Sequence, residues 1–329
     1  MAEKPRVLVY GAGVLGCSIA HALCVAGKSE VSLLARGAWA DAIERDGIRI
    51  RHVVQRRTTC DRVRVVRALA DGERYDLIIV AMQAHQAPEA LASLAASTCD
   101  KLVFVGNDAD AAGLEARIDA LASYPKECAF GFFSVGGGRE NGEVVVAHVK
   151  LALTVGAATG DLSRGFTELL EGLGISVNLQ DHMDGWLKWH AACILPMAYL
   201  SYAHGCDLTQ ATGAEIALYL DACAELGRLF KERGIPIRPA GDDEYFYGGP
   251  RRLYMRAFYT VVFETALGRL CVTDHCLHAV GEMRSLAEVL ERLLALDDRR
   301  EPAPSYWTLK EMMPSWEDLL VDPTTNRGV

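Results

Sequence analysis

Residues 7–16 read V-L-V-Y-G-A-G-V-L-G, an apolar run that leads directly into three glycines. The spacing of Gly11, Gly13 and Gly16 is that of the G-x-G-x-x-G turn, which joins the first strand of a βαβ unit to its helix. The first glycine allows a tight bend, the second lets a pyrophosphate approach the backbone, and the third lets the helix pack closely on the strand. The stretch predicts a Rossmann-type dinucleotide-binding domain. A plain βα turn that binds no ligand is the alternative.

The residues that follow the turn complete a βαβ unit. A helix-like apolar run covers residues 18–26 and ends at Gly27, and a strand-like run covers residues 31–35. The N-terminus of such a helix offers free N–H groups and a positive dipole end to phosphates. We therefore expect six residues of the turn to contact the cofactor: Gly11, Ala12, Gly13, Val14, Leu15 and Gly16.

The end of the second strand predicts which dinucleotide is preferred. Chains that select NAD usually place Asp or Glu there, where the carboxylate bonds the ribose 2′-hydroxyl. This chain has Arg36 at that place and no acidic residue before Asp41. Because a guanidinium is a bidentate partner for a phosphate, Arg36 predicts NADPH as the cofactor. The alternative is a solvated arginine at a strand end.

Composition and charge narrow the function classes. The chain has 329 residues, of which 50% are hydrophobic, so it can bury a sizeable core and is long enough for two domains. The net charge is −9 and no basic block occurs, so nucleic acid and an anionic membrane surface are disfavoured as partners. The ten cysteines include no C-x-x-C pair, as is typical of a reducing compartment. With no signal peptide or bilayer-spanning stretch recognised, we expect a cytoplasmic protein.

The order of the expected elements divides the chain near residue 182. Strand-like and helix-like segments alternate before it, as in a mostly parallel sheet covered by helices. A glycine-rich turn and two β-branched runs at 134–155 predict an antiparallel extension of that sheet. Beyond residue 184, apolar helix-like runs follow without convincing strands. We predict an α/β Rossmann-like domain at 1–182, an all-α substrate or dimerisation domain at 183–313, and a poorly ordered tail at 314–329.

Several segments together resemble the ketopantoate reductase family. They are the glycine turn with Arg36, A-I-E-R-D-G-I-R-I at 42–50, D-L-I-I-V-A-M-Q-A-H-Q at 76–86, V-F-V-G-N-D at 103–108, R-E-N-G-E-V-V-V-A-H-V at 139–149 and D-H-M-D-G-W-L-K-W-H at 181–190. The likeness covers roughly the first two-thirds of the chain. It implies a Rossmann-type domain followed by a helical one, and the NADPH-dependent reduction of a small 2-oxo acid.

The resemblance also implies roles for individual residues. Lys188 matches the family's general acid, which protonates the 2-oxo oxygen as hydride reaches the carbonyl carbon. An efficient acid needs a lowered pKa, and we expect Trp186 and Trp189 to desolvate the lysine. Asn107, after the strand 101–106, matches the asparagine beside the nicotinamide and the substrate. The alternatives are an ammonium that merely reaches water and a turn-forming asparagine.

The substrate part of the chain departs from the family pattern. Gln83 replaces a lysine and is still expected to contact the cofactor, whereas Asp108 replaces a glycine. Ala192 replaces an asparagine one helical turn after Lys188, so a hydrogen bond to the substrate is missing. Asp274 matches the family's late carboxylate only loosely and is a candidate substrate contact. We therefore do not expect ketopantoate itself to be a good substrate.

A cluster of polar residues late in the chain has two interpretations. Its spacing would place the side chains on one face of a helix, as a metal site or as a polar wall or dimer face. We favour the second interpretation and predict no metal. The cluster consists of Cys271, Asp274, His275, His278 and Glu282.

Two classes of function remain open. The leading hypothesis is an NADPH-dependent reductase of a small 2-oxo acid or a related carbonyl, acting as a monomer or a homodimer; an opine-type imine reductase is a variant of it. The rival is a catalytically inactive or redox-sensing NADP(H)-binding protein. Lys188 favours the enzyme, whereas Gln83, Asp108 and Ala192 favour the rival.

Overall fold

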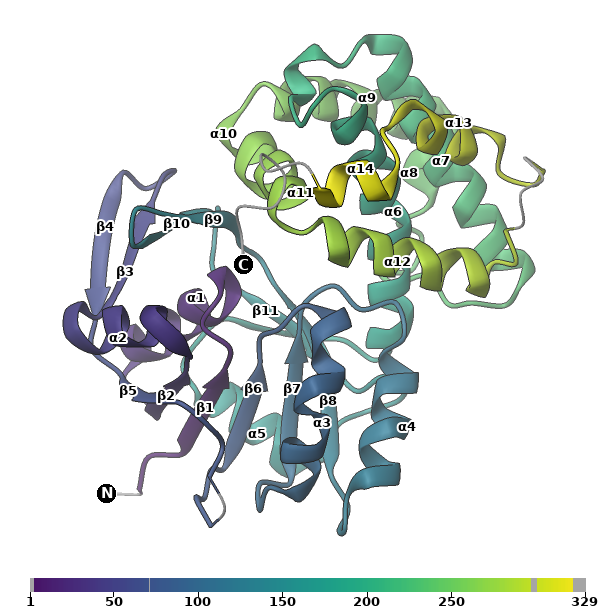
Figure 1. Cartoon of the computed structure of the whole chain (residues 1–329). Helices are drawn as coiled ribbons and strands as arrows, with labels where there is room; N and C mark the ends of the chain where they lie inside the picture. Colours follow the sequence, from purple (N-terminus) through teal and green to yellow (C-terminus); the bar gives the residue numbers. More distant parts are fainter. Residues whose placement is uncertain (1–2, 71, 297–300, 322–329) are drawn as a thin grey trace. The chain divides into compact units, whose positions relative to one another are not determined.

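The computed structural model consists of two compact units. It describes residues 3–70, 72–296 and 301–321. The first unit comprises residues 1–106 and 110–184, and the second comprises residues 107–109 and 185–329. In the described part of the chain every strand belongs to the first unit, and the second contains helices but no strand (Figure 1). The predicted fold class, an α/β Rossmann-type domain followed by an all-α domain, is confirmed.

An eight-stranded sheet forms the centre of the first unit, in the order β12-β11-β8-β7-β6-β1-β2-β5. Every neighbouring pair from β8 to β5 is parallel, and β11 runs antiparallel to β8. Because β1 lies between β2 and β6, the strand order reverses there, which makes it the topological switch point where open α/β sheets bind ligands. The strands are β1 (Arg6–Tyr10), β2 (Glu30–Leu34), β5 (Arg64–Val66), β6 (Leu77–Val80), β7 (Lys101–Val105), β8 (Glu127–Phe133), β11 (Leu153–Gly156) and β12 (Val177–Leu179).

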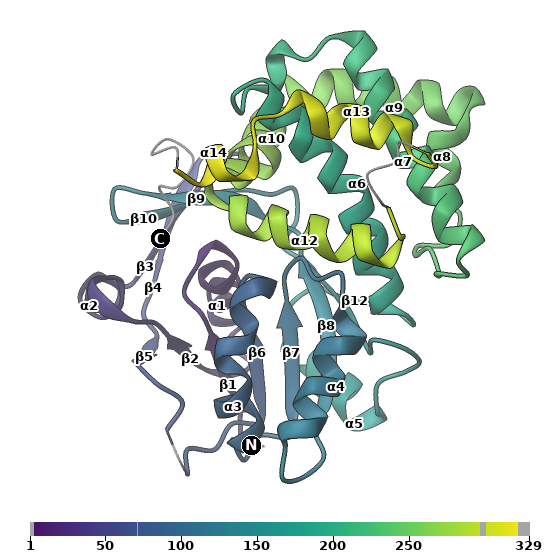
Figure 2. The same cartoon turned by 45° about the vertical axis from the view of Figure 1, so that its right-hand side comes forward.

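Helices cover both faces of this sheet. α1 (Val14–Ala26) and α5 (Arg164–Gly172) share one buried core with alternate residues of the strands. α3 (Ala87–Ala96) and α4 (Ala111–Leu121) lie in front of the opposite face in Figure 2. Because successive side chains of a strand point to opposite faces, strands covered on both sides are apolar throughout. This explains the continuous apolar runs in the sequence of the central strands.

A second sheet has four strands in the order β4-β3-β10-β9. The antiparallel extension predicted at 134–155 is therefore only partly right. β11 does extend the large sheet, but β9 and β10 form a hairpin in which β10 pairs with β3. The cause is burial, because Val144 and Val146 of β10 and the isoleucines of β3 belong to the core that contains α1. The strands are β3 (Ile48–His52), β4 (Arg57–Asp61), β9 (Gly136–Glu140) and β10 (Glu143–Ala147).

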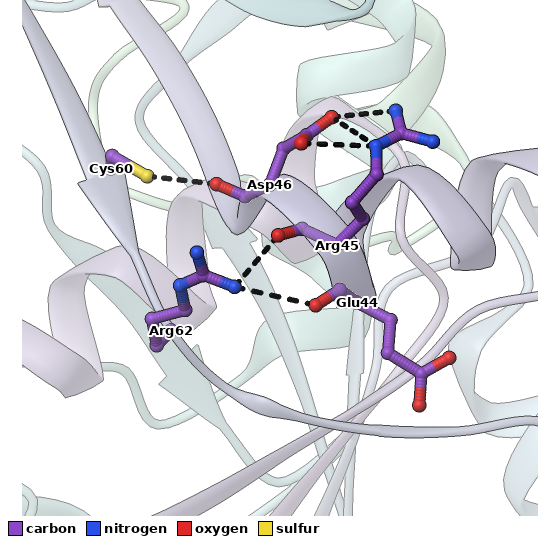
Figure 3. A network of polar contacts seen from close by, with 5 residues as sticks. All are labelled: Glu44, Arg45, Asp46, Cys60 and Arg62. Carbon is purple, nitrogen blue, oxygen red and sulfur yellow. Dashed lines mark hydrogen bonds and ion pairs between the residues drawn. The ribbon is translucent and has the colours of Figure 1, made fainter.

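The C-terminal end of α2 (Gly37–Asp46) is tied to β4 and to the residue after it (Figure 3). Arg62 donates a hydrogen bond of 2.8 Å from Nη1 to the carbonyl oxygen of Arg45. The Cys60 thiol donates one of 3.1 Å to the carbonyl oxygen of Asp46. These donors satisfy carbonyl groups that a helix end leaves without partners, and a cation there suits the helix dipole.

Three buried histidines join α1 to the second sheet. His21 Nδ1 of α1 lies 2.7 Å from Asp61 Oδ2 of β4, and its ring centroid lies 5.1 Å from that of His52 of β3. His52 Nδ1 lies 3.0 Å from His148 Nε2, and His52 Nε2 lies 3.0 Å from Thr59 Oγ1. Burial, with the nearby charges of the other histidines and an arginine, lowers the pKa of His52 to about 4. Burial also lowers the pKa of His148.

This cluster predicts a loss of stability in mild acid. Between the ordinary pKa of 6.5 and the folded pKa of about 4, His52 binds a proton only in the unfolded chain. The protein therefore keeps its full stability above about pH 6.5, and its free energy of unfolding falls as the pH drops from there toward about pH 4. From about pH 7.5 to about pH 5, His52 alone accounts for a loss of about 2 kcal/mol in the free energy of unfolding.

Urea unfolding at the two pH values measures this effect. The His52→Gln variant is expected to lose less stability on acidification than the wild type, whatever its stability at the higher pH. His85→Gln removes an exposed histidine and is the matched control. Equal losses in the wild type and the His52→Gln variant would contradict the prediction.

The second unit is organised around α6 (Met183–Ala203), of which residues 185–203 lie in it, and α7 (Gly213–Glu232). α7 begins with a capping box, in which Thr212 and Glu215 bond each other's backbone N–H groups. The other helices are α8 (Glu244–Tyr247), α9 (Gly249–Phe263), α10 (Ala266–Gly268), α11 (Asp274–His278), α12 (Val280–Leu293), α13 (Pro304–Met312) and α14 (Trp316–Val321).

The end of the chain departs from the prediction of a poorly ordered tail at 314–329. Residues 316–321 form α14, whose Leu319 is buried in the core of the second unit. The segment is polar in overall composition, but apolar residues within it pack against the core of the second unit. Residues 322–329 lie outside the described residues. Among the residues that are described, no helix combines the length and the apolar character needed to cross a bilayer.

Candidate functional site

The glycine turn joins β1 to α1 at the carboxyl edge of the large sheet. Gly11 has a φ of 112°, and a Cβ there would lie 2.5 Å from the carbonyl oxygen of Ala81. A Cβ at Gly16 would lie 1.8 Å from the carbonyl oxygen of Gly11, so the helix packs directly on the turn. A Cβ at Gly13 would have no described protein atom within 4 Å. The fold thus requires the outer two glycines, whereas the middle one faces open space through which a ligand can approach the backbone.

The helix end beyond the turn is suited to an anion. Gly13 is the N-cap of α1, and no side chain of the described residues caps this end. The first turn carries no acidic residue. The backbone N–H groups of that turn and the positive end of the helix dipole are therefore available to phosphate oxygens. These features fit a dinucleotide pyrophosphate.

Arg36 stands beside the turn on the neighbouring strand. β2 pairs in parallel with β1, and the Gly11 N–H donates a hydrogen bond of 3.2 Å to the carbonyl oxygen of Leu34. Arg36 comes two residues later, is exposed, and is the N-cap of α2. No ion pair of its guanidinium occurs among the described residues. Its charge is therefore available to a ligand.

Gln83 lies on the other side of the turn. It follows β6, which pairs in parallel with β1, and it is the N-cap of a short 3₁₀ helix (Ala84–Gln86). The adjacent Met82 packs close to Gly11, with its Cγ 3.4 Å from the position of a Cβ there. The structure thus brings the glycine turn, Arg36 and Gln83 to one edge of the large sheet. Asn107, Lys188 and Asp274 belong to the second unit.

Asn107 has an unpartnered polar atom. It directly follows Gly106 at the end of β7, and its side chain is buried with 8% exposure. Its Nδ2 lies 3.4 Å from His275 Nε2, whereas its buried Oδ1 has no hydrogen-bond partner among the described residues. A buried acceptor without a partner costs about 1–3 kcal/mol, and such a group is typical of a ligand site.

Lys188 lies on α6 and is partly buried. Trp189 is directed differently from Lys188, because neighbouring residues of a helix point about 100° apart. Trp189 is 2% exposed, packs against Phe230, and donates a hydrogen bond of 2.7 Å from Nε1 to Asp242 Oδ2.

The other tryptophan also has a partner on its own helix. The Trp186 ring stacks on His190 one turn later, at 5.1 Å between centroids and 16° between planes. Burial, with a smaller contribution from the charge of His275, lowers the pKa of His190 to about 4. His190 is therefore neutral at pH 7. Ala192, at the place of the family asparagine, is completely buried in the core of the second unit.

The sequence predicted that the polar residues around α11 would lie on one face of a single helix, and the structure shows that they do not. A π-helical turn (Arg269–Thr273) precedes α11, and Ala279, with a φ of −133°, breaks the helix before α12. Within the described residues, no group of three or more His, Cys, Asp or Glu side chains is placed to hold a metal ion. π-helical turns are frequent at functional sites.

His275 is the residue of this segment that the sequence analysis missed as a site residue. Its Nε2 lies 3.5 Å from Glu282 Oε2, in addition to its contact with Asn107. The neighbouring Asp274, the predicted substrate contact, instead faces Arg269 at 3.6 Å. No spacing motif links residues 107 and 275, so only the fold reveals this pair.

The comparisons find likeness to one family. Residues 7–160, just under half of the chain, match the family model of ketopantoate reductase PanE/ApbA. This part of the protein is therefore similar to that family. A 2-dehydropantoate 2-reductase of Mesorhizobium japonicum is 31% identical over 93 residues. These residues are 27% of this chain and 27% of that relative, so the alignment spans about a quarter of the relative's length.

Solved structures share the ketopantoate reductase fold over nearly the whole chain. The 2-dehydropantoate 2-reductase from Geobacter metallireducens GS-15 has a TM-score of 0.70 at 16% identity, over 94% of this chain and 98% of that one. A D-mandelate dehydrogenase, solved with NADH and anilino(oxo)acetate, has a TM-score of 0.67 at 14% identity, over 96% of this chain and 100% of that one. These likenesses establish the fold of both units.

Proposed function

We propose that the protein is an NADPH-dependent reductase of a small 2-oxo acid or a related carbonyl. The observation that carries the proposal is the glycine turn, whose Gly13 faces open space at the switch point of the sheet. Arg36 stands beside this turn and forms no ion pair with any residue that the structure describes. The match of residues 7–160 to the ketopantoate reductase family model supports the reaction class. One relative is named 2-dehydropantoate 2-reductase, and one similar structure is a D-mandelate dehydrogenase. These names support a substrate with a carboxylate beside the carbonyl.

Each residue has a separate task in this proposal. The N–H groups at the start of α1 bind the pyrophosphate, and Arg36 binds the adenosine 2′-phosphate. When bound, the cofactor supplies the hydride. Asn107 uses its unpartnered Oδ1 to orient the nicotinamide or the substrate. Lys188 Nζ donates the proton to the 2-oxo oxygen, and because it is only partly buried it regains a proton from water.

Ketopantoate is not the substrate that we propose. The family asparagine is replaced by Ala192, which is fully buried, and a glycine of the family is replaced by Asp108. A hydrogen bond that is missing in the transition state lowers kcat/KM even when the substrate still fits. A panel of 2-oxo acids and imines, followed by NADPH absorbance, identifies the substrate class.

The same replacements support a second candidate function. With Gln83 in place of the family lysine, the chain can retain the cofactor and lack turnover, as a redox-sensing NADP(H)-binding protein does. Tight NADPH binding without Lys188-dependent oxidation on any member of the panel would establish this alternative and reject the reductase.

Cofactor choice is tested by replacing Arg36. We expect the wild type to bind NADPH more tightly than NADH, and Arg36→Ala to weaken NADPH tenfold or more while NADH changes little. The reason is that a lost charged hydrogen-bond pair costs about 1.5–3 kcal/mol. Titration calorimetry with both cofactors measures the two affinities.

A matched control removes a charge elsewhere on the first unit. Arg164→Ala takes away an arginine whose side chain is 92% exposed on α5, and it is expected to leave both affinities unchanged. Equal affinities of the wild type for NADPH and NADH would reject the assignment of Arg36 to the 2′-phosphate.

A further inference from the structure

The geometry points to a second cationic contact for the cofactor, formed by Arg139 of β9 and Trp39 of α2. We infer that Arg139 binds the pyrophosphate of the dinucleotide and that Trp39 positions it over the glycine turn. The inference rests on the proposed function, in that it requires a nicotinamide dinucleotide at this turn. Neither residue belongs to a motif that predicts cofactor contact.

Trp39 is bonded to the turn itself. Its indole Nε1 donates a hydrogen bond of 2.8 Å to the carbonyl oxygen of Ala12, the residue between the first two glycines. The same carbonyl oxygen accepts a weaker bond of 3.4 Å from the Cys17 thiol. The carbonyl group of Ala12 therefore points toward protein donors. Through this hydrogen bond, Trp39 connects α2 to the turn over which a pyrophosphate would bind.

Arg139 lies against this tryptophan. Its Cζ is 5.6 Å from the centroid of the Trp39 ring, which is within the range of a cation–π contact. The positive charge of Arg139 also reaches α1: burial raises the pKa of the Cys17 thiol to about 12, and Arg139 opposes this rise. The guanidinium thus contacts Trp39, and its charge acts on the helix that follows the glycines.

The second sheet holds Arg139 in this place. In both views β9 passes beside α1 (Figures 1 and 2). Gly137 lets β9 lie close against β10, because a Cβ there would lie 1.9 Å from the carbonyl oxygen of Val145 of β10. Arg139 is paired with Val144 of β10, so its backbone has a fixed register. Its side chain is exposed and can reach a ligand.

This arrangement has the chemistry of a phosphate site. A guanidinium in cation–π contact with an aromatic ring is more ordered than one without such a contact, so it binds a phosphate with a smaller entropic cost. Its charge adds to the N–H groups of the helix N-terminus. Because the pyrophosphate is common to NADH and NADPH, loss of Arg139 acts on both cofactors, whereas loss of Arg36 acts on NADPH alone.

Titration calorimetry with NADPH, NADH and ADP-ribose tests whether Arg139 binds the pyrophosphate while Arg36 binds the 2′-phosphate. We expect Arg139→Gln to weaken all three ligands by a similar factor of about ten, and Arg139→Lys to recover part of the loss. Trp39→Phe retains a ring but loses the indole donor, and we expect a smaller loss that is again equal for the three ligands. Quenching of the tryptophan fluorescence by each ligand, compared between the wild type and Trp39→Phe, gives a second readout.

Two controls separate the outcomes. Arg49→Gln removes an exposed arginine from β3 of the same sheet and is expected to leave the affinities unchanged. Thermal unfolding of every variant verifies that the fold is intact. If the wild type binds the cofactors and Arg139→Gln changes no affinity by more than about twofold, or weakens NADPH alone, the inference is overturned and the proposed function stands. A wild type that binds none of the three ligands would overturn both.

Discussion

Replacing Lys188 by alanine is expected to lower turnover by about 10²-fold or more and to leave NADPH affinity nearly unchanged. The proton donor acts only when negative charge develops on the carbonyl oxygen, so its loss affects kcat rather than cofactor binding. Lys188 lies in the second unit, whereas the glycine turn and Arg36 lie in the first, so the substitution leaves the cofactor residues intact.

Steady-state oxidation of NADPH with the best member of the 2-oxo-acid panel measures the effect on turnover. Lys188→Arg is the informative companion, because arginine retains the positive charge but does not release a proton near neutral pH. We expect this variant to be about as slow as Lys188→Ala. An active arginine variant would assign Lys188 an electrostatic role, and a fully active alanine variant would reject it as the acid.

The glycine turn predicts a contrast between two neighbouring substitutions. Gly13→Val is expected to keep the fold, because a Cβ there meets no described protein atom and the φ of −75° is open to any residue. The added side chain occupies the space of the pyrophosphate, so NADPH affinity should fall by about 100-fold or more. Gly16→Ala has the opposite effect, because its Cβ would lie 1.8 Å from the carbonyl oxygen of Gly11.

Urea unfolding and calorimetry, applied to both variants, separate fold from function at this turn. We expect Gly16→Ala to lose about 2 kcal/mol or more of unfolding free energy, as overpacked sites do, and Gly13→Val to lose little. A Gly13→Val variant that binds NADPH like the wild type would show that the pyrophosphate does not approach this glycine. Such a result would reject the proposed cofactor site, since no other contact could compensate for a blocked turn.

The first βαβ unit was predictable because its determinants are local. The bend at Gly11, the close packing at Gly16 and the apolar periodicity around them depend on residues next to one another in the chain. The second sheet was not predictable in the same way. β3 and β10 are separated by about 90 residues, and the pairing of Ile50 with Val144 depends on a shared core over α1 that no local pattern contains.

The residues of the candidate site also fall into two groups, those that local sequence predicts and those that only the fold brings together. The glycine spacing and Arg36 at the end of the second strand were evident in the sequence, because a strand, a turn and a helix place them. The contact between Asn107 and His275 was not, because those residues are 168 positions apart and a π-helical turn sets the direction of the histidine. The hydrogen bond from Trp39 to Ala12 likewise joins two elements across the sheet edge.

By itself, the sequence determined the α/β-then-α order and the glycine turn, since steric limits on glycine and the periodicity of buried side chains act over a few residues. Only the tertiary structure decided which of the polar and aromatic side chains are buried in the core and which remain exposed. Trp189 illustrates this: it is next to Lys188 in the chain, but the rotation of a helix by about 100° per residue directs its ring toward Phe230 and Asp242. The position of a residue in the chain does not specify the direction in which its side chain points; the packing of the helices determines that direction.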